Sequence, residues 1–284
     1  IKSEGDIDLQ TPLYEIGVQG IFTRALDLAL LNNEIDLAVH SMKDVPVQPA
    51  IGTSQAAVLK RASWKDLLVY KGEWEVISKG LGLTNGQLPG MNPNSLLQFT
   101  VATSSIRRKA QWLNRYPHHK VENLRGNVNT RLAKLERNDW NAAIFAAAGL
   151  ERIGLRPPNS MELDWMLPAP AQGAIIVICR ENDESCLEAC QFLNDMDTMH
   201  CTRIERDFLR TLLGGCSTPI SAFAEVKNEQ VHFRGNIMSV DGKERMDIEK
   251  ICGVGNSEWV GKDSAQELLE NGARKIMNSF QNAR

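Results

Sequence analysis

Several features that mark specialised classes of protein are absent from this sequence. No apolar run approaches the ~18 residues that a transmembrane helix needs, so no membrane partner is expected. There is no basic excess, because 32 lysines and arginines stand against 35 aspartates and glutamates. The resulting net charge of −3 argues against general nucleic-acid binding. The residues Ile1–Asp6 lack the apolar core of a secretory signal peptide.

Motifs that bind metals or nucleotides are missing as well. None of the six cysteines lies in a C-x-x-C pair, and the five histidines show no metal-ligand spacing, so we expect no metal site. The glycine-rich G-x-G-x-x-G loop and the Walker motif are absent, as is the G-x-S-x-G of serine hydrolases. With no secretory context, the cysteines are expected to be reduced and mostly buried, in a cytoplasmic protein.

What remains is a globular composition, with enough chain for about two or three domains. Of the 284 residues, 43% are hydrophobic and 24% are charged. Strand-like and helix-like segments alternate through the first two-thirds, which predicts an α/β fold with a largely parallel sheet. Residues 79–98 hold four glycines and two prolines and predict a loop or domain junction. Strands within 222–252 and a helix over 264–280 predict a final α+β unit.

A cation and a carboxylate are adjacent in the loop after the strand predicted over 35–39. Ligands of open α/β sheets bind at the carboxyl ends of strands, which is where Lys43 and Asp44 would lie. Such a pair could transfer a proton or bind a polar ligand. A pair of solvated charges is the alternative interpretation, and spacing alone does not separate the two.

Two further strand ends carry the residues of an anion site. In each, a helix begins directly after a strand, so unpaired N–H groups and the positive end of the helix dipole meet arginine side chains. Arginine suits carboxylates because its planar fork binds both oxygens. The first site comprises Thr103, Ser104, Ser105, Arg107 and Arg108, and the second Arg125, Gly126, Asn127 and Arg131. Together they predict a ligand with several negative groups, although each alone could be a capped helix with solvated arginines.

One cysteine differs from the other five in its surroundings. Cys216 follows Gly214 and Gly215, so it is predicted on a loop at the end of a helix, where glycine is the usual cap. Its thiol could be a nucleophile or a covalent attachment point. The negative end of the helix dipole does not favour a low thiol pKa, so a fixed thioether fits better than a cycling nucleophile. A buried apolar cysteine is the alternative.

Six segments occur together in an order known from one enzyme family. They are AVHSMKDVP (38–46), ATSSIRR (102–108), NLRGNVNTRL (123–132), AAAGLERIGL (146–155), LPAPAQGAI (167–175) and ERDFLRTLLGGC (205–216). In these segments the sequence resembles porphobilinogen deaminase (hydroxymethylbilane synthase). The resemblance implies a cytoplasmic, monomeric transferase of haem biosynthesis. Such an enzyme condenses four porphobilinogen molecules head to tail into hydroxymethylbilane and releases ammonia.

The resemblance also implies a three-domain α/β architecture. Two lobes similar to those of periplasmic binding proteins, with a mainly parallel sheet, would enclose the active cleft, and a small α+β C-terminal domain would follow. The expected bounds are 1–78 with 171–195 for domain 1, 79–98 for an extended linker, 99–170 for domain 2 and 196–284 for domain 3.

A dipyrromethane cofactor, joined to Cys216 through a thioether, is implied by the same resemblance. Asp44 and Lys43 would be catalytic, with Asp44 facing the pyrrole N–H groups. The implied cofactor contacts are Ser41, Lys43, Asp44, Thr103, Ser104, Ser105, Arg107, Arg108, Arg125 and Gly126. The implied substrate contacts are Arg107, Arg125, Arg131, Gln172 and Gln19.

The sequence departs from the family at its beginning. Family members start with a strand–helix–strand unit of roughly 30 residues or more, the scale of a βαβ unit, and Ile1–Asp6 matches only its end. Gln19 stands where the family often has lysine. The chain as written is therefore expected to be unstable in domain 1 and inactive. A non-catalytic two-lobed anion-binding protein or an inactive homologue is the alternative hypothesis.

Overall fold

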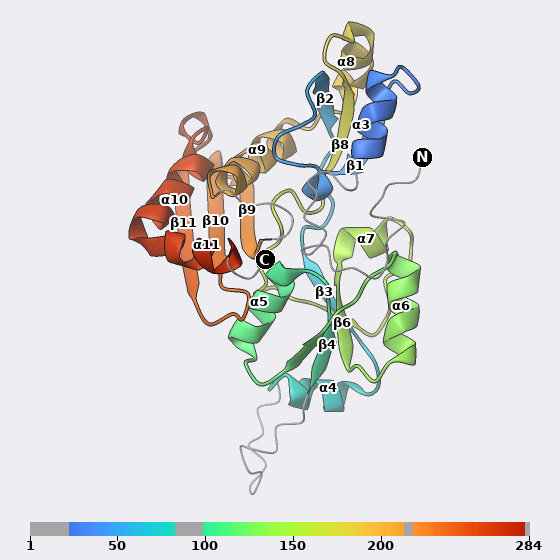
Figure 1. Ribbon diagram of the computed structural model, residues 1–284, viewed down its shortest axis with the longest axis vertical. Coiled ribbons are helices and arrows are strands. Elements are labelled where there is room, and N and C mark those ends of the chain that lie inside the picture. Colours follow the sequence, from blue (N-terminus) through green and yellow to red (C-terminus); the bar gives the residue numbers. More distant parts are fainter. Residues whose placement is uncertain (1–22, 83–98, 213–217, 282–284) are drawn as a thin grey trace, which may run out of the picture.

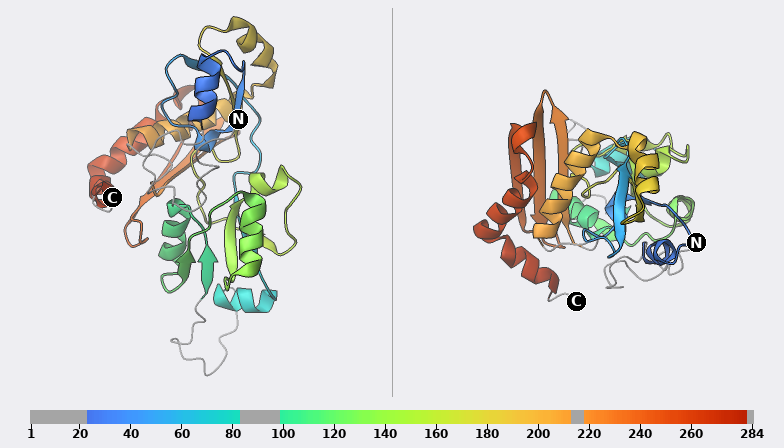
Figure 2. Two further views of the ribbon diagram at one scale, coloured as in Figure 1. Left: turned by 45° about the vertical axis from the view of Figure 1, so that its right-hand side comes forward. Right: turned by 90° about the horizontal axis from the view of Figure 1, so that it is seen from above.

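The computed structural model describes residues 23–82, 99–212 and 218–281, and these residues form three β-sheets with their own helices (Figure 1). The first two sheets belong to two lobes that lie end to end, and the third sheet lies beside them (Figure 2). None of the helices in these ranges is long and apolar enough to cross a bilayer.

The first lobe is built on a three-stranded sheet in the order β1-β8-β2, from β1 (Ala38–Ser41), β2 (Thr53–Val58) and β8 (Ile175–Arg180). Both outer strands pair antiparallel with β8, whose nearly continuous apolar sequence suits a central buried strand. Its helices are α3 (Arg24–Leu31), α8 (Glu184–Cys190) and the short η3 (Gln191–Leu193). Leu30, Val58 and Ile176 belong to the core of this lobe.

The second lobe is built on a five-stranded mixed sheet in the order β5-β4-β6-β3-β7. Its strands are β3 (Asp66–Tyr70), β4 (Thr100–Ala102), β5 (Lys120–Glu122), β6 (Ala142–Ala146) and β7 (Ser160–Glu162). Its helices are α4 (Trp74–Gly80), α5 (Ile106–Arg115), α6 (Val128–Arg137) and α7 (Ala147–Glu151). Two apolar clusters fill this lobe, one around Trp112 and Ile144 and the other around Leu67 and Phe145.

The sheet pairing corrects the boundary expected at residue 78. Strand β3 pairs with β6 and β7, so residues 66–82 belong with the second lobe, and the chain crosses between lobes near 59–65. The residues Leu67–Val69 are buried and take an inner position in the sheet, which explains the placement. The expected linker 79–98 therefore begins inside the second lobe, at the end of α4, and its residues 83–98 lie outside the described ranges.

The expectation of a mainly parallel sheet was also wrong. Among the described strands only β4 with β5 and β4 with β6 are parallel pairs. Each strand that enters a lobe after a crossing, β3 in the second lobe and β8 in the first, runs antiparallel to its neighbours. The apolar pattern of a buried strand indicates burial on both faces but says nothing about strand direction.

The C-terminal unit has an antiparallel sheet in the order β11-β10-β9, as the α+β prediction required. Its strands are β9 (Ile220–Lys227), β10 (Gln230–Met238) and β11 (Arg245–Gly253). Its helical segments are α9 (Met196–Thr211), η4 (Val254–Asn256), α10 (Val260–Leu268), the π-helical η5 (Leu269–Ala273) and α11 (Arg274–Gln281). Gly261 lets α10 approach α9 closely, since a Cβ there would lie 2.0 Å from the Ile204 carbonyl oxygen.

The two segments that cross between the lobes lie side by side. The Ala62 N–H donates to the Gly173 carbonyl oxygen at 3.2 Å, and the Leu59 N–H donates to Ile175 at 3.0 Å. Arg61 on the first crossing forms an ion pair of 2.6 Å with the fully buried Glu205 on α9. The C-terminal unit is thereby attached at the point where the two lobes join.

Candidate active site

The loop that carries the predicted catalytic pair follows β1 directly and forms a single 3-10 turn, η1 (Met42–Asp44). Its position is set by the Met42 N–H, which donates to the Ala174 carbonyl oxygen at 3.0 Å, and by the buried side chains of Met42 and Val45. Lys43 and Asp44 lie between these two anchors and are partly exposed. The prediction of a loop at a strand's carboxyl end is confirmed.

The hydroxyl groups predicted at the start of α5 shape the turn into the helix. Ser105 is the N-cap, and its hydroxyl accepts from the Arg108 N–H at 3.4 Å. Thr103 Oγ1 accepts from the Ser105 N–H at 3.2 Å, and the Ser104 hydroxyl donates to the Leu124 carbonyl oxygen. All three hydroxyls are therefore engaged locally, and their contact with a cofactor stays a prediction.

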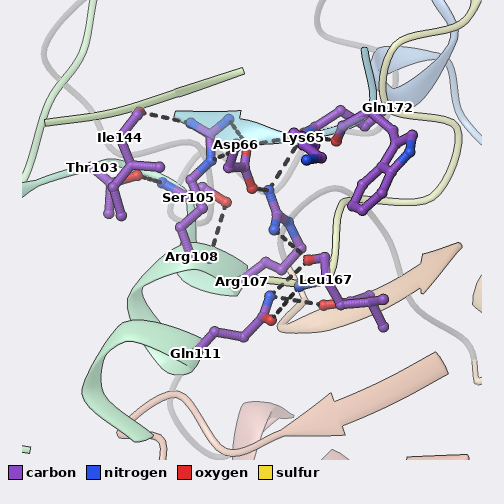
Figure 3. Close-up of polar contacts among 12 residues, drawn as sticks. Lys65, Asp66, Thr103, Ser105, Arg107, Arg108, Gln111, Ile144, Leu167 and Gln172 are labelled. Atoms are coloured by element: carbon purple, nitrogen blue, oxygen red, sulfur yellow. Dashed lines mark hydrogen bonds and ion pairs between the residues drawn. The ribbon is translucent and has the colours of Figure 1, made fainter. Parts of the chain in front are cut away.

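Arg107 and Arg108 both bind one buried carboxylate, that of Asp66 (Figure 3). Arg107 Nη2 lies 2.8 Å from Asp66 Oδ2, and Arg108 Nη2 lies 2.7 Å from Oδ1. The exposed fractions of Asp66, Arg107 and Arg108 are 0%, 4% and 5%. Burial alone would raise the pKa of Asp66, but the two guanidiniums outweigh it and hold this pKa at about 2.

Gln172 belongs to the same cluster. Its amide donates to Asp66 Oδ1 at 2.9 Å and to the Trp64 carbonyl oxygen at 2.7 Å, so it ties the second crossing segment to the first. Arg107 also donates to the Leu167 carbonyl oxygen at 2.7 Å. The structure thus places Gln172 in the junction of the lobes and directs most donors of the two arginines to protein acceptors.

One donor of this cluster is left over. Arg107 Nε is buried and has no hydrogen-bond partner within the described ranges. Buried donors are almost always satisfied by protein, water or ligand, so an orphan of this kind is expected where an acceptor binds. Arg107 therefore keeps one N–H that an ordered water or a ligand oxygen would satisfy.

The second predicted anion site follows the next strand, β5, and lies at the start of α6. Asn127 caps this helix by accepting from the Thr130 N–H at 2.9 Å, and Arg131 Nε donates to the Gly126 carbonyl oxygen at 2.6 Å. Gly126 has a φ of +116°, and a Cβ there would lie 2.7 Å from Thr130 Cγ2. Glycine is required because the backbone is left-handed and the space beside it is filled.

The charged side chains of the two predicted anion sites and of the η1 loop lie close enough to shift one another's pKa values. Burial, with the like charges of Arg108 and Arg125, lowers the pKa of Arg131 to about 10. Burial also lowers the pKa of Lys43. The positive charges of Arg107 and Arg108 lower this pKa further, and the negative charges of Asp44 and Asp66 raise it. Five cations, Lys43, Arg107, Arg108, Arg125 and Arg131, thus stand against two carboxylates, Asp44 and Asp66. This surplus of positive charge calls for an anionic ligand with several negative groups.

Three predicted site residues lie apart from this cluster or outside the described ranges. Ser41 is exposed at the end of β1. Gln19 and Cys216 fall outside the described residues, so their contacts stay predictions.

Burial raises the thiol pKa of four cysteines that the structure does describe, Cys179, Cys186, Cys201 and Cys252, in the case of Cys201 to about 12.

Asp66 is the residue of the cluster that sequence reasoning missed. It opens an apolar strand, and its two arginine partners lie 41 and 42 positions further along the chain. The sequence offers one sign of its role, because Asp66 is an acidic residue at the start of a strand whose next residues are apolar.

Comparison with known proteins assigns the chain to a family. Residues 1–188 match the family model described as porphobilinogen deaminase, dipyromethane cofactor binding domain, and residues 199–270 match the porphobilinogen deaminase C-terminal domain. The chain belongs to the porphobilinogen deaminase family. The sequence resemblance, the α/β fold with a separate C-terminal domain and the dipyrromethane cofactor are thereby confirmed.

Relatives named porphobilinogen deaminase match along nearly the whole chain. The one from Chloroherpeton thalassium is 36% identical over 283 residues, which cover 98% of this chain and 85% of the relative. The one from Geobacillus kaustophilus is 38% identical over 280 residues, with 98% and 85% covered. Among solved structures, the periplasmic VFT2 domain of BvgS from Bordetella pertussis is similar at 15% identity and a TM-score of 0.34, over 62% of this chain and 69% of that one. Family membership follows from the sequence matches alone.

Proposed function

We propose that this chain is a transferase that condenses four porphobilinogen molecules head to tail into hydroxymethylbilane, with release of ammonia, in tetrapyrrole synthesis. The observation that carries the proposal is the grouping of five cationic side chains around two carboxylates where the lobes join, which leaves a net surplus of three positive charges. Each porphobilinogen carries an acetate and a propionate, so the growing product accumulates carboxylates. A site with a built-in excess of positive charge is suited to hold them.

Asp44 is the acid–base group of this proposal. Its carboxylic acid protonates the departing amine, and its carboxylate then stabilises the cationic pyrrole that remains and accepts the proton released when two pyrroles are joined. One carboxyl group can serve both steps because the proton it gives in the first is returned in the second. Lys43, next in sequence, holds a substrate carboxylate and adjusts the charge around Asp44.

The residues present fit a dipyrromethane. Two pyrroles with acetate and propionate side chains carry four negative groups, which the net surplus of three positive charges and the unfilled N–H of Arg107 are suited to bind. When bound, this cofactor supplies the pyrrole carbon to which the first porphobilinogen is joined. Cys216 would hold it through a thioether and would break no bond during elongation. Arg125 and Arg131 would bind its carboxylates beside the glycine at 126.

Turnover of porphobilinogen by an Asp44→Asn variant tests the proposal. We expect ammonia release to fall about 100- to 10,000-fold, because a positioned acid–base group contributes that much. The matched control is Asp247→Asn, since Asp247 is a carboxylate on β11 paired with Arg245, away from the cluster. Near-normal turnover by Asp44→Asn would remove Asp44 from the mechanism. Porphobilinogen binding without any turnover in the unaltered chain would favour a non-catalytic anion-binding protein instead.

We further propose that the enzyme acts as a monomer in the cytoplasm, without nucleic-acid or membrane partners. The net charge of −3 argues against general nucleic-acid binding, and the family resemblance implies the monomer and the cytoplasmic location. Light scattering on the purified protein should give a mass near the 31.6 kDa of one chain. A mass of twice that value would refute the monomer.

A further inference from the structure

One side chain of the C-terminal unit reaches across to the loop that carries the catalytic pair. Arg206 on α9 donates from Nη1 to the carbonyl oxygens of Met42 at 3.2 Å and Val45 at 2.9 Å, and from Nη2 to Pro46 at 2.6 Å. A single guanidinium thus binds backbone oxygens on both sides of Lys43 and Asp44. Hydrogen bonds from a charged group are about twice as strong as those between neutral groups.

Among the described residues, the carbonyl groups of this loop have few other hydrogen-bond donors. The η1 turn has one backbone bond of its own, from the Val45 N–H to the Met42 oxygen at 3.2 Å, and Pro46 has no N–H to donate. A cavity of about 350 Å³ lies behind the loop, bordered by Met42, Val45 and Arg206, so packing against this side is incomplete. The Met42 N–H and the buried side chains of Met42 and Val45 hold the loop on one side, and the guanidinium of Arg206 holds its carbonyl groups on the other.

A second arginine on α9, one helical turn after Arg206, also binds this loop. Arg210 donates to the Val47 carbonyl oxygen at 2.8 Å and is itself paired with Asp207 at 2.6 Å. Residues four apart share a helix face, so Arg206 and Arg210 form one row of donors along the loop. The helix α9 ends at Thr211, shortly before Cys216 in sequence, and so connects the loop to the segment of the attachment residue.

We propose that Arg206 is a positioning residue for the condensation reaction. It holds the backbone of η1 so that Asp44 and Lys43 face the arginines of the second lobe. It acts through backbone carbonyl groups and not through the substrate. The inference rests on the proposed role of Asp44 and adds to it the group that sets the position of Asp44.

Turnover kinetics of Arg206→Ala and Arg206→Lys test this role. Because a misplacement of about 1 Å can cost about 100-fold in rate, we expect Arg206→Ala to lower kcat about 10- to 100-fold with little change in KM. Arg206→Lys should recover only part of the loss, since an ammonium lacks the planar fork that reaches several acceptors. The matched control is Arg203→Ala on the same helix, whose exposed guanidinium pairs with Glu258 at 3.0 Å, and it should keep the original kcat.

Chemical rescue separates positioning from general destabilisation. Millimolar guanidinium should restore part of the kcat of Arg206→Ala, while methylammonium at the same concentration should not, because only guanidinium replaces the missing fork. Intact mass should show that the covalent cofactor is still attached. If Arg206→Ala does not fold, Arg206→Lys provides the same comparison. Unchanged kcat in both variants, or a loss explained wholly by missing cofactor, would overturn the proposal.

A double-variant cycle links Arg206 to Asp44. If Arg206 acts through the loop, Arg206→Ala should cost little further activity once Asp44→Asn is present. Losses that multiply independently would show that Arg206 acts elsewhere. The two proposals fail in different ways: an active Asp44→Asn enzyme contradicts the proposed function, whereas an inactive Asp44→Asn enzyme beside a fully active Arg206→Ala enzyme contradicts only the positioning role.

Discussion

Replacing Asp66 by asparagine tests the buried cluster beneath the site. The change keeps the size of the side chain and removes its charge, which leaves Arg107 and Arg108 buried without their shared carboxylate. Removing one partner of a buried ion pair costs about 3–5 kcal/mol, because the remaining charge is desolvated and uncompensated. We expect the free energy of unfolding at pH 7 to fall by this amount.

The pH dependence of the difference gives a second, independent magnitude. The pKa of Asp66 falls from 3.8 in the unfolded chain to about 2 in the folded protein, so the ionised group stabilises the fold above pH 3.8. At 1.36 kcal/mol per pKa unit this contribution is about 2 kcal/mol, and it is lost as the pH falls from about 4 to 2. The stability gap between wild type and Asp66→Asn should therefore narrow by about 2 kcal/mol over this range.

Urea unfolding followed by tryptophan fluorescence measures both quantities, since Trp112 is fully buried in the same lobe. Asp164→Asn is the matched control, because Asp164 is 75% exposed and pairs only with Lys65 within the part of the chain described, so its loss should cost less than about 1 kcal/mol. A difference in unfolding free energy between wild type and Asp66→Asn below about 1 kcal/mol at pH 7, or a difference that does not change down to pH 2, would show that Asp66 does not stabilise the fold as a buried ion-pair partner.

Two further predictions concern the second anion site, at the start of α6. Arg131→Leu should raise the KM for porphobilinogen about 10- to 100-fold, because a hydrogen bond to a charged group contributes about 1.5–3 kcal/mol, while Arg137→Leu, exposed on the same helix, should not. An unchanged KM in saturation kinetics would exclude Arg131 from substrate binding. Gly126→Ala should lower the unfolding free energy in urea by about 1–3 kcal/mol, since the backbone there is left-handed and crowded by Thr130. Gly149→Ala, which has open space around it, should be neutral or stabilising, and equal effects of the two would contradict the strain.

Local features of the site could be predicted from the sequence because each depends on neighbouring residues. Ser or Asn directly before an amphipathic stretch marks a helix start, and Ser105 and Asn127 are the N-caps of α5 and α6. A strand followed by Lys43 and Asp44 likewise marked the η1 loop, although β1 covers Ala38–Ser41 and not 35–39, and its residues alternate between buried and exposed where a buried strand was expected. These patterns are short-range, so one segment is enough to find each of them.

The long-range parts of the site could not be predicted. The pairing of Asp66 with Arg107, and the contact of Arg206 with Pro46 across 160 positions, join segments that have no local signature of each other. The same holds for β3, whose apolar sequence predicts a strand but not the sheet that it joins. Such contacts depend on topology, which here was set by two chain crossings between the lobes.

The mass of the denatured intact protein, after exposure to porphobilinogen, shows directly whether the chain carries the covalent cofactor. We expect an excess mass equal to one dipyrromethane, located by peptide mapping on the peptide that contains Cys216, and absent from a Cys216→Ser variant. A bare polypeptide mass, or an excess located on another residue, would contradict the attachment of a dipyrromethane to Cys216.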